Sequence, residues 1–335
     1  MSGTTTLTQT PGPVTRLVLT PATSSITVGF TQTYTAEGFD QFGNDAGNVT
    51  SATTFIITNS GSCTGTACTG APGSYTVTGT EGTAMGTASL TVTKAATTTT
   101  VTSSPSAFGD PATFTAHVTP TPTNPLTPTG TVSFYLNGAT TPFATVPVSA
   151  DGTASTTTSA LPAGSNTVTA VYSGDTNFTT STSGVTPVTV GGVSTTITGV
   201  HRGAIIVAAG QTVVLTGATQ YGSVVVQPGG RLDVENSTIN GALTANKSAA
   251  LRVCGSTITG SVTVTNATGF VLIGDPADGC AVNTIGGSLI VEHNHNRVQV
   301  IGNHVAGAVV AYDNTGSGPF PTNTNTTATV SGNGH

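Results

Sequence analysis

A short motif that begins with glycine recurs through the last third of the chain. In each copy the glycine is followed by Ala or Ser and then by an apolar-x-apolar step, and the first four copies are evenly spaced. The six glycines are Gly203, Gly222, Gly241, Gly260, Gly287 and Gly307. A fixed period of roughly 20 residues is typical of stacked repeats, each of which buries its apolar face against its neighbours. The period therefore predicts a solenoid.

Aligning the glycines shows three groups of apolar positions in each repeat. The first group follows the glycine by two and four places, as in Ile205 and Val207, and the third lies two places before the next glycine, as in Ile239. The second group comprises the pairs Val213 and Leu215, Leu232 and Val234, Leu251 and Val253, Phe270 and Leu272, and Val298 and Val300. Three short strands per repeat with these residues pointing inward predict a triangular parallel β-helix over residues 192–335. Each of its rungs, meaning single turns, has about 19 residues, and the last is incomplete.

One corner of each rung carries residue types that tolerate positive φ, namely Gly217, Asn236, Gly255 and Gly302. Between Gly260 and Gly287 the spacing is longer than elsewhere, and we assign the excess to residues 275–283 at this corner, which include Cys280. Cys254 stands just before the same corner one rung below. Stacked strands lie about 4.8 Å apart, which is within the Cα–Cα range of disulfides. The alignment therefore predicts a Cys254–Cys280 bridge.

Composition excludes several classes of function. Charged residues make up 6% of the chain, the net charge is −6 and only seven Lys and Arg are present, so we expect no binding to nucleic acid and no insertion into membranes. Cys63 and Cys68 form a second close pair, without zinc-like spacing to other ligands. Four residues between them suit a disulfide at a hairpin tip better than a redox motif, which has two. Two disulfides imply an oxidising, extracellular compartment.

The part of the chain before the solenoid follows a different pattern. Residues 1–14 are polar and are predicted to be a linker. Residues 15–94 and 95–191 each contain short runs in which apolar residues alternate with Thr, and turn residues recur every eight to twelve positions. This predicts two tandem antiparallel β-sandwiches. The segment 164–169 also repeats the segment 73–78 at an offset of 91.

The string from Leu161 to Phe178, with Gly130 to Tyr135 upstream, resembles the bacterial Ig-like repeats of large secreted and cell-surface proteins. Residues 36–44 of the first segment resemble the same group less closely. The resemblance covers roughly 175 residues, and its motifs specify fold better than function. It implies Ig-like domains that act as spacers, stalks or adhesive modules without catalysis.

Few polar residues have the spacing of a chemical site. Asp233 and Arg252 share an outward column on adjacent rungs, which predicts a weak surface ion pair. His293 and His295 could face the same side and bind a metal, although their segment is also typical of a solvated corner. In the first sandwich, Asp40 could supply an oxygen to calcium or simply form a turn.

The acids of the solenoid do not suit catalysis. Polysaccharide lyases and hydrolases on β-helices need paired carboxylates or carboxylate-bound calcium, and no two acids here share an outward column on adjacent rungs. We therefore expect no enzyme activity and no cofactor.

A seventh repeat begins near Gly332 and stops shortly afterwards. Its open edge is expected either to be covered by further chain or to stack on another subunit. The repeat pattern resembles that of the bactofilins, which polymerise end to end.

Together these patterns predict a non-enzymatic structural or adhesive protein of the bacterial surface, with an Ig-like stalk and a rigid β-helix that self-associates or contacts cell-wall components, in a fibre or matrix. The alternative is a carbohydrate-binding or polysaccharide-degrading β-helix with Ig-like accessory domains.

Overall fold

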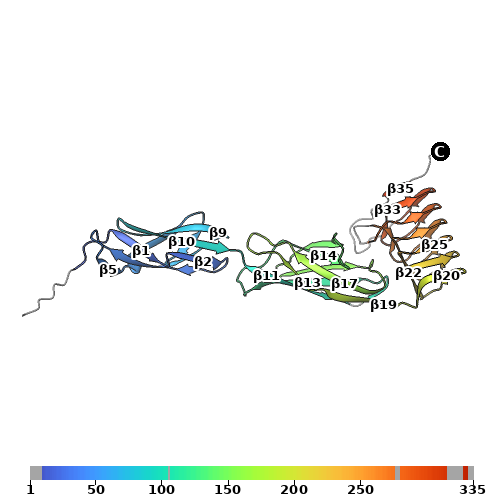
Figure 1. The fold of residues 1–335 in the computed structure, drawn as a ribbon, viewed down its shortest axis with the longest axis horizontal. Coiled ribbons are helices and arrows are strands. Elements are labelled where there is room, and N and C mark those ends of the chain that lie inside the picture. The colour runs from blue at the N-terminus through green and yellow to red at the C-terminus, as the bar shows by residue number, and fades with distance from the viewer. Residues whose placement is uncertain (1–9, 105, 276–279, 315–326, 331–335) are drawn as a thin grey trace, which may run out of the picture.

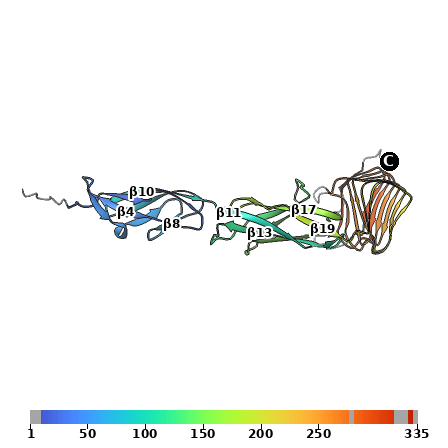
Figure 2. The ribbon, with the colours of Figure 1, turned by 60° about the horizontal axis from the view of Figure 1, so that its bottom comes forward.

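The structure, a computed structural model, describes residues 10–104, 106–275, 280–314 and 327–330. These residues form strands joined by turns, with one 3-10 turn at Thr50–Ala52. No helix in this part of the chain is long and apolar enough to cross a membrane. Figures 1 and 2 show two elongated sandwiches in line, with the β-helix at their far end. The rungs of the β-helix are stacked across the long axis of the sandwiches (Figure 1).

The first sandwich surrounds a core that includes Leu17, Tyr34 and Leu90. Its larger sheet contains β1 (Arg16–Thr20), β2 (Thr23–Thr27), β4 (Thr35–Phe39), β5 (Asp45–Asn48), β6 (Thr54–Ile57), β9 (Gly73–Glu81) and β10 (Ala84–Thr93). The smaller sheet contains β3 (Gln32–Thr33), β7 (Ser62–Thr64) and β8 (Ala67–Thr69). The predicted alternation is visible in β10, where buried Ala88, Leu90 and Val92 alternate with exposed residues.

The second sandwich has two sheets packed around Phe114, Phe134, Tyr172 and Phe178, all fully buried. One sheet contains β11 (Ala96–Ser103), β13 (Ala112–Thr121) and β16 (Thr153–Thr158). The other contains β12 (Ser106–Ala107), β14 (Thr131–Leu136), β15 (Ala144–Pro147), β17 (Gly164–Tyr172), β18 (Ser181–Thr182) and β19 (Thr186–Gly191).

The β-helix has three faces of parallel strands, as the period predicted. The first face contains β21 (Ile205–Val207), β23 (Val224–Val226), β26 (Leu243–Asn246), β29 (Val262–Thr265), β32 (Leu289–Glu292) and β34 (Val309–Tyr312). The second contains β24 (Arg231–Glu235), β27 (Ala250–Cys254) and β30 (Val271–Gly274), and the third contains β25 (Thr238–Asn240), β28 (Thr257–Ile258), β31 (Thr284–Ile285) and β35 (Thr327–Val330). The long strands β20 (Thr195–Arg202), β22 (Thr212–Tyr221) and β33 (Val298–Val305) continue round the corner and join these two faces into one sheet.

The repeated glycines allow the rungs to approach closely. A Cβ atom on Gly241 would lie 2.7 Å from the carbonyl carbon of Gly222, and one on Gly260 would lie 2.8 Å from the carbonyl oxygen of Gly241. Contacts this short are not tolerated by any side chain, so the motif needs glycine for space as well as for its backbone. This accounts for the column that the sequence shows.

The predicted corner is present. Gly217, Asn236, Gly255 and Gly302 have φ values of 58°, 48°, 57° and 73°. A second corner, after the first face, also uses the left-handed region, which the alignment of the glycines did not predict. There the residues are Gly210, Gly229, Lys247, Asn266, His293 and Asp313.

One inward pair was wrong. Val271 and Ile273, not Phe270 and Leu272, point into the β-helix, because Leu251 pairs with Val271, whereas the regular period would place Phe270 opposite it. Relative to the regular spacing of the rungs, this rung therefore has one extra residue before β30. The other extra residues follow β30, because the next aligned pair, Thr257 with Thr284, has a larger offset in the sequence. Four consecutive apolar residues fit either register, so the apolar pattern alone could not choose between them.

A polar plug closes the β-helix core at the rung where the chain enters. The inward column of the third face reads His201, Gln220, Ile239, Ile258, Ile285 and Val305, so only its first two positions are polar. Gln220 is fully buried and donates a hydrogen bond to the Gly222 carbonyl oxygen at 3.2 Å. His201 lies beside it in β20, with Nδ1 2.6 Å from Gln220 Oε1. Polar residues at the end of an apolar column are typical of a capped terminal repeat.

Candidate functional site at the junction of the second sandwich and the β-helix

The second face of the β-helix packs against the end of the second sandwich. Ala250, Cys254, Phe270, Leu272 and Cys280 point away from the β-helix axis, and they belong to the same apolar cluster as the sandwich core. The inward residues of the β-helix form a separate cluster. The junction is therefore a continuous apolar contact between two folding units.

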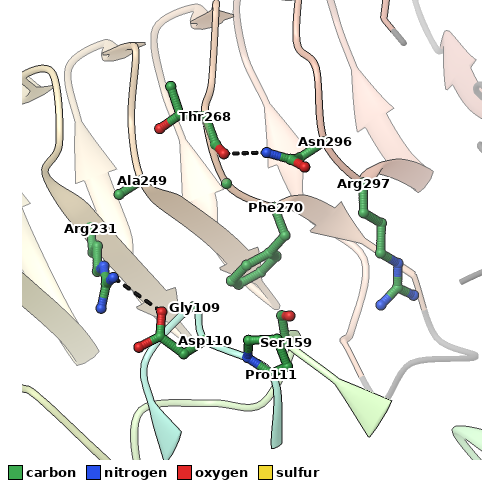
Figure 3. Close-up of a pocket in the computed structure, with 11 residues that line it drawn as sticks. Gly109, Asp110, Pro111, Ser159, Arg231, Ala249, Thr268, Phe270, Asn296 and Arg297 are labelled. Carbon is green, nitrogen blue, oxygen red and sulfur yellow. Dashed lines mark hydrogen bonds and ion pairs between the residues drawn. The ribbon is translucent and has the colours of Figure 1, made fainter. Parts of the chain in front are cut away.

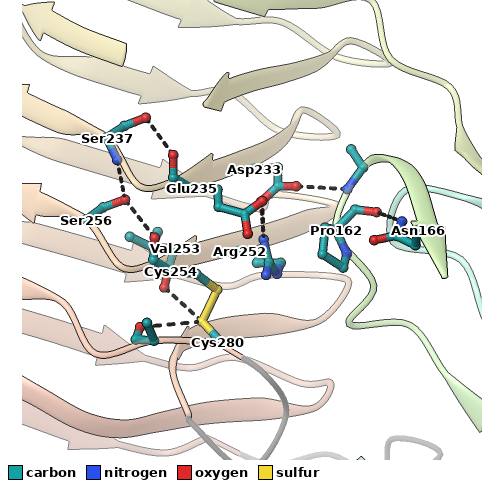
Figure 4. Close-up of polar contacts among 12 residues, drawn as sticks. Pro162, Asn166, Asp233, Glu235, Ser237, Arg252, Val253, Cys254, Ser256 and Cys280 are labelled. Carbon is teal, nitrogen blue, oxygen red and sulfur yellow. Dashed lines mark hydrogen bonds and ion pairs between the residues drawn. A yellow bond between two sulfur atoms is a disulfide. The ribbon is translucent and has the colours of Figure 1, made fainter. Parts of the chain in front are cut away.

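A buried ion pair lies in this contact (Figure 4). Arg252 Nη1 lies 3.0 Å from Asp233 Oδ1 and 3.6 Å from Glu235 Oε2. The Arg252 and Asp233 side chains are 2% and 1% exposed. Their cross-rung pairing follows the predicted column, but the predicted surface exposure was wrong, because the second sandwich covers this face of the β-helix. A sequence alignment of rungs cannot show what packs on an outward column.

The second sandwich contributes directly to this pair. Ala163 donates its backbone N–H to Asp233 Oδ2 at 2.9 Å. The loop that presents Ala163 is held by Asn166, whose buried side-chain amide donates to the Pro162 carbonyl oxygen at 2.8 Å (Figure 4). Burial raises the pKa of the Asp233 carboxyl, while Arg252 and the Ala163 N–H act in the opposite direction.

Aromatic packing forms the second part of the junction. Phe108 of the second sandwich and Phe270 of the β-helix make an edge-to-face contact with ring centroids 5.8 Å apart. Next to Phe108, Gly109 has a φ of 91°, and a Cβ atom there would lie 2.7 Å from Cβ of Ala250. Both the left-handed backbone and the close approach need glycine at this position.

A pocket lies at the edge of the junction and is lined from both sides (Figure 3). Its volume is about 360 Å³. Asp110 and Ser159 come from the second sandwich, and Arg231, Phe270 and Asn296 come from the β-helix. Arg231 Nη2 lies 3.2 Å from Asp110 Oδ1, and both side chains are partly exposed, at 27% and 51%.

Both predicted disulfides are present. Cys254 and Cys280 are bonded with their Cα atoms 4.9 Å apart, and both are buried beside the junction. Cys63 and Cys68 face each other across the β7–β8 hairpin with Cα atoms 4.0 Å apart. The Cys254–Cys280 bridge therefore ties the inserted segment to the face of the β-helix that contacts the second sandwich.

The remaining candidates do not assemble into a site. His293 lies at a left-handed corner, and its Nε2 is 3.5 Å from Asp313 Oδ2. His295 is exposed, and buried Asn294 separates it from His293 in the sequence. Within the described ranges, no group of three or more His, Cys, Asp or Glu residues could hold a metal ion.

The Asp40 carboxylate of the first sandwich accepts hydrogen bonds from the N–H groups of Gly12, Phe42 and Asn44 and from the Asn44 side-chain amide. Asp40 therefore forms a turn, which was the alternative to a calcium ligand. The break at Gly332 lies outside the described residues.

Two asparagine ladders were not predicted. Asn283 Nδ2 donates to Asn303 Oδ1 at 2.9 Å, and Asn294 Nδ2 donates to Asn314 Oδ1 at 2.8 Å. Asn283, Asn294 and Asn303 are fully buried, and they satisfy backbone groups where the corners turn. In each pair the two asparagines lie one repeat apart in the sequence, and this spacing was the signal that could have revealed them.

Comparison with known proteins assigns part of this architecture to a family. Residues 98–191 match the model of the bacterial Ig-like domain, group 3. The second sandwich is therefore a bacterial Ig-like domain, as the motif from Leu161 to Phe178 indicated. No curated protein matches the chain.

Among solved structures, the chain is similar to the S-layer protein rSbsC(31-844), with 26% identity over 55% of this chain and 29% of that chain, and a TM-score of 0.26. It is also similar to the Yersinia pseudotuberculosis adhesin InvE, with 14% identity over 52% of this chain and 58% of that chain, and a TM-score of 0.28. The chain thus spans less than a third of the S-layer protein and just over half of the adhesin. At these TM-scores neither likeness supports an argument about function.

Proposed function

We propose that this chain is a non-enzymatic structural module of the bacterial exterior, in which two Ig-like sandwiches form a stalk that holds the β-helix in a fixed orientation across its end. Bacterial Ig-like domains point to an extracellular structural or adhesive role, and two disulfides agree with that location. The observation that carries the proposal is the buried junction, because an apolar contact with a desolvated ion pair suits a rigid connection better than a flexible linker.

The joint between the two sandwiches supports a continuous stalk. Lys94, at the end of the first sandwich, donates its side-chain ammonium to the Asp175 carbonyl oxygen of the second sandwich. Asn124 of the second sandwich donates its amide to the Val28 carbonyl oxygen of the first sandwich at 2.7 Å. These two hydrogen bonds connect the sandwiches next to the point where the chain passes from one to the other, and they favour a restricted joint.

Two acids of the β-helix, Asp233 and Glu235, serve the junction rather than a catalytic pair. Asp233 is held by Arg252 and Ala163, and Glu235 Oε2 lies 3.6 Å from the same Arg252 Nη1. A carboxylate that accepts two structural hydrogen bonds is poorly placed to transfer protons to a substrate. This supports the non-enzymatic proposal.

Small-angle scattering and negative-stain microscopy of the full chain would test the proposal. We expect a single shape, with two domains in line and a third body projecting sideways. A scattering curve that requires many β-helix orientations would contradict it. Phe270→Ala should increase the spread of orientations, whereas Phe42→Ala, which removes an exposed phenyl ring from the first sandwich, should leave the spread unchanged.

A second proposal is that the polar residues of the first rung prevent the β-helix from stacking head to tail in any self-association of the chain. Head-to-tail stacking of β-helices would bury His201, which lies on the first rung, against the core of another copy, and this costs free energy unless every polar group finds a partner. We therefore expect no head-to-tail filament. Light scattering over a range of concentrations tests this: a monomer or a discrete oligomer agrees with the expectation, His201→Leu should favour longer assemblies, and open-ended growth of the unaltered chain would contradict it.

A further inference from the structure

We propose that the pocket at the junction binds one or two sugar units of an extracellular polysaccharide. This inference goes beyond the structural role, since it assigns a ligand to a surface that a rigid joint does not need. The pocket exists only where the second sandwich and the β-helix meet, because Asp110 and Ser159 line it from one side and Arg231 and Asn296 from the other (Figure 3).

The size of the pocket suits such a ligand. Binding sites for small molecules have volumes of roughly 300 to 1,000 Å³, and this pocket has about 360 Å³. One sugar ring and part of a second therefore fit, with the remainder of a polysaccharide chain in solvent.

The ion pair of Asp110 and Arg231 favours hydroxyl groups as ligands. The carboxylate accepts hydrogen bonds and the guanidinium donates them, and both present two atoms in a plane. Adjacent sugar hydroxyls can donate to one group and accept from the other. An apolar ligand would desolvate this pair without replacing its interactions, and a phosphate would meet the Asp110 charge together with that of Arg231.

Neutral polar groups and one aromatic ring complete the lining. The Ser159 hydroxyl can both donate and accept, and the Asn296 amide is fixed by donation to the Thr268 carbonyl oxygen. Phe270 supplies an apolar wall between Arg231 and Arg297 (Figure 3). A sugar ring has the same mixture, with C–H groups on its faces and hydroxyls at its edge.

Binding of the full chain to a printed array of bacterial and plant glycans, both neutral and uronic acid-containing, tests the proposal. The best glycan from the array is then titrated against variants by calorimetry. Arg231→Ala should weaken binding by roughly 10-fold or more, as expected for losing a charged hydrogen-bond donor. Ser159→Tyr, which fills the pocket from the sandwich side, should abolish binding. Arg202→Ala, a matched loss of an exposed arginine that lies over Tyr221 away from the pocket, should not change it.

Two results would overturn the proposal: no retention of any glycan on the array, or retention that Arg231→Ala and Ser159→Tyr leave unchanged. Thermal unfolding of each variant checks that the fold is intact. The sugar site rests on the junction, but the orientation of the β-helix is measured by scattering without a ligand, so failure of the structural proposal and failure of the sugar site can be told apart.

Discussion

Ala163 in the second sandwich donates its backbone N–H to Asp233 in the β-helix at 2.9 Å, although the two residues lie far apart in the sequence. Arg252 holds the other oxygen of the same carboxylate, so one buried side chain connects two rungs of the β-helix to the neighbouring domain. The orientation of the β-helix thus depends on a few identifiable atoms, which makes it open to mutation.

Replacing Arg252 by Met should strongly destabilise the β-helix and its junction. The substitution leaves Asp233 buried without its cation, and breaking a buried pair in this way costs about 3 to 5 kcal/mol. Arg231→Met is the matched control, because its pair with Asp110 is partly exposed and exposed pairs contribute at most about 1 kcal/mol. Denaturant unfolding of both variants measures the difference. Equal effects would show that Arg252 is not buried as described.

The corner residues make a second prediction. Gly217 has a φ of 58° and nothing within 4 Å of the position of a Cβ atom, so Gly217→Ala tests backbone conformation alone. We expect a loss of roughly 1 to 2 kcal/mol, the usual cost of a left-handed L-residue. Gly217→Asn should cost less, since Asn236 occupies the same corner one rung on with a φ of 48°. Gly255→Ala should cost more, because its Cβ would lie 2.6 Å from Asn236 Oδ1.

The two disulfides should differ in their effect on stability. Cys254 and Cys280 are separated by 26 positions in the sequence, and Cys63 and Cys68 by 5. On the chain-entropy model, removing these bridges by paired Cys→Ala substitution costs about 3.5 and about 2 kcal/mol respectively. Calorimetric unfolding of the two double variants checks the order. A larger loss from the Cys63–Cys68 pair would show that loop entropy does not set their contributions.

Acid should destabilise the second sandwich through Asp175. Burial alone would raise the pKa of this carboxyl, but hydrogen bonds from Thr129, Asn177 and Phe178 outweigh it and lower the pKa below its usual value of 3.8. The stabilisation is therefore complete above about pH 4 and is lost as the pH falls through the lowered pKa. Asp175→Asn should reduce the pH dependence of the unfolding free energy in that range. An unchanged dependence would contradict this assignment.

The sequence predicted the architecture well because its repeats are regular in the features that matter to a β-helix. The glycine period, the inward columns and the pairing of Cys254 with Cys280 all follow from alignment of the rungs. The motif around Tyr172 indicated the Ig-like domain correctly.

Periodicity could not reveal what depends on contacts between repeats and another domain. Asp233 and Arg252 lie on an outward column that would be solvated in an isolated β-helix, and only the packed sandwich makes them buried. Phe270 was assigned to the core for a related reason, because an outward phenylalanine is expected only where something covers it. The pocket joins Asp110 to Arg231, which are distant in the sequence, and no local pattern relates them.

The position of the junction also determines how the molecule would carry mechanical load. The backbone enters the β-helix at its first rung through β20, whereas the stalk contacts later rungs through Asp233, Arg252 and Phe270. A pull along the stalk is therefore shared between the entering strand and the side of the β-helix. We therefore expect force to unfold the first rung only after the buried contact around the Asp233–Arg252 ion pair has broken.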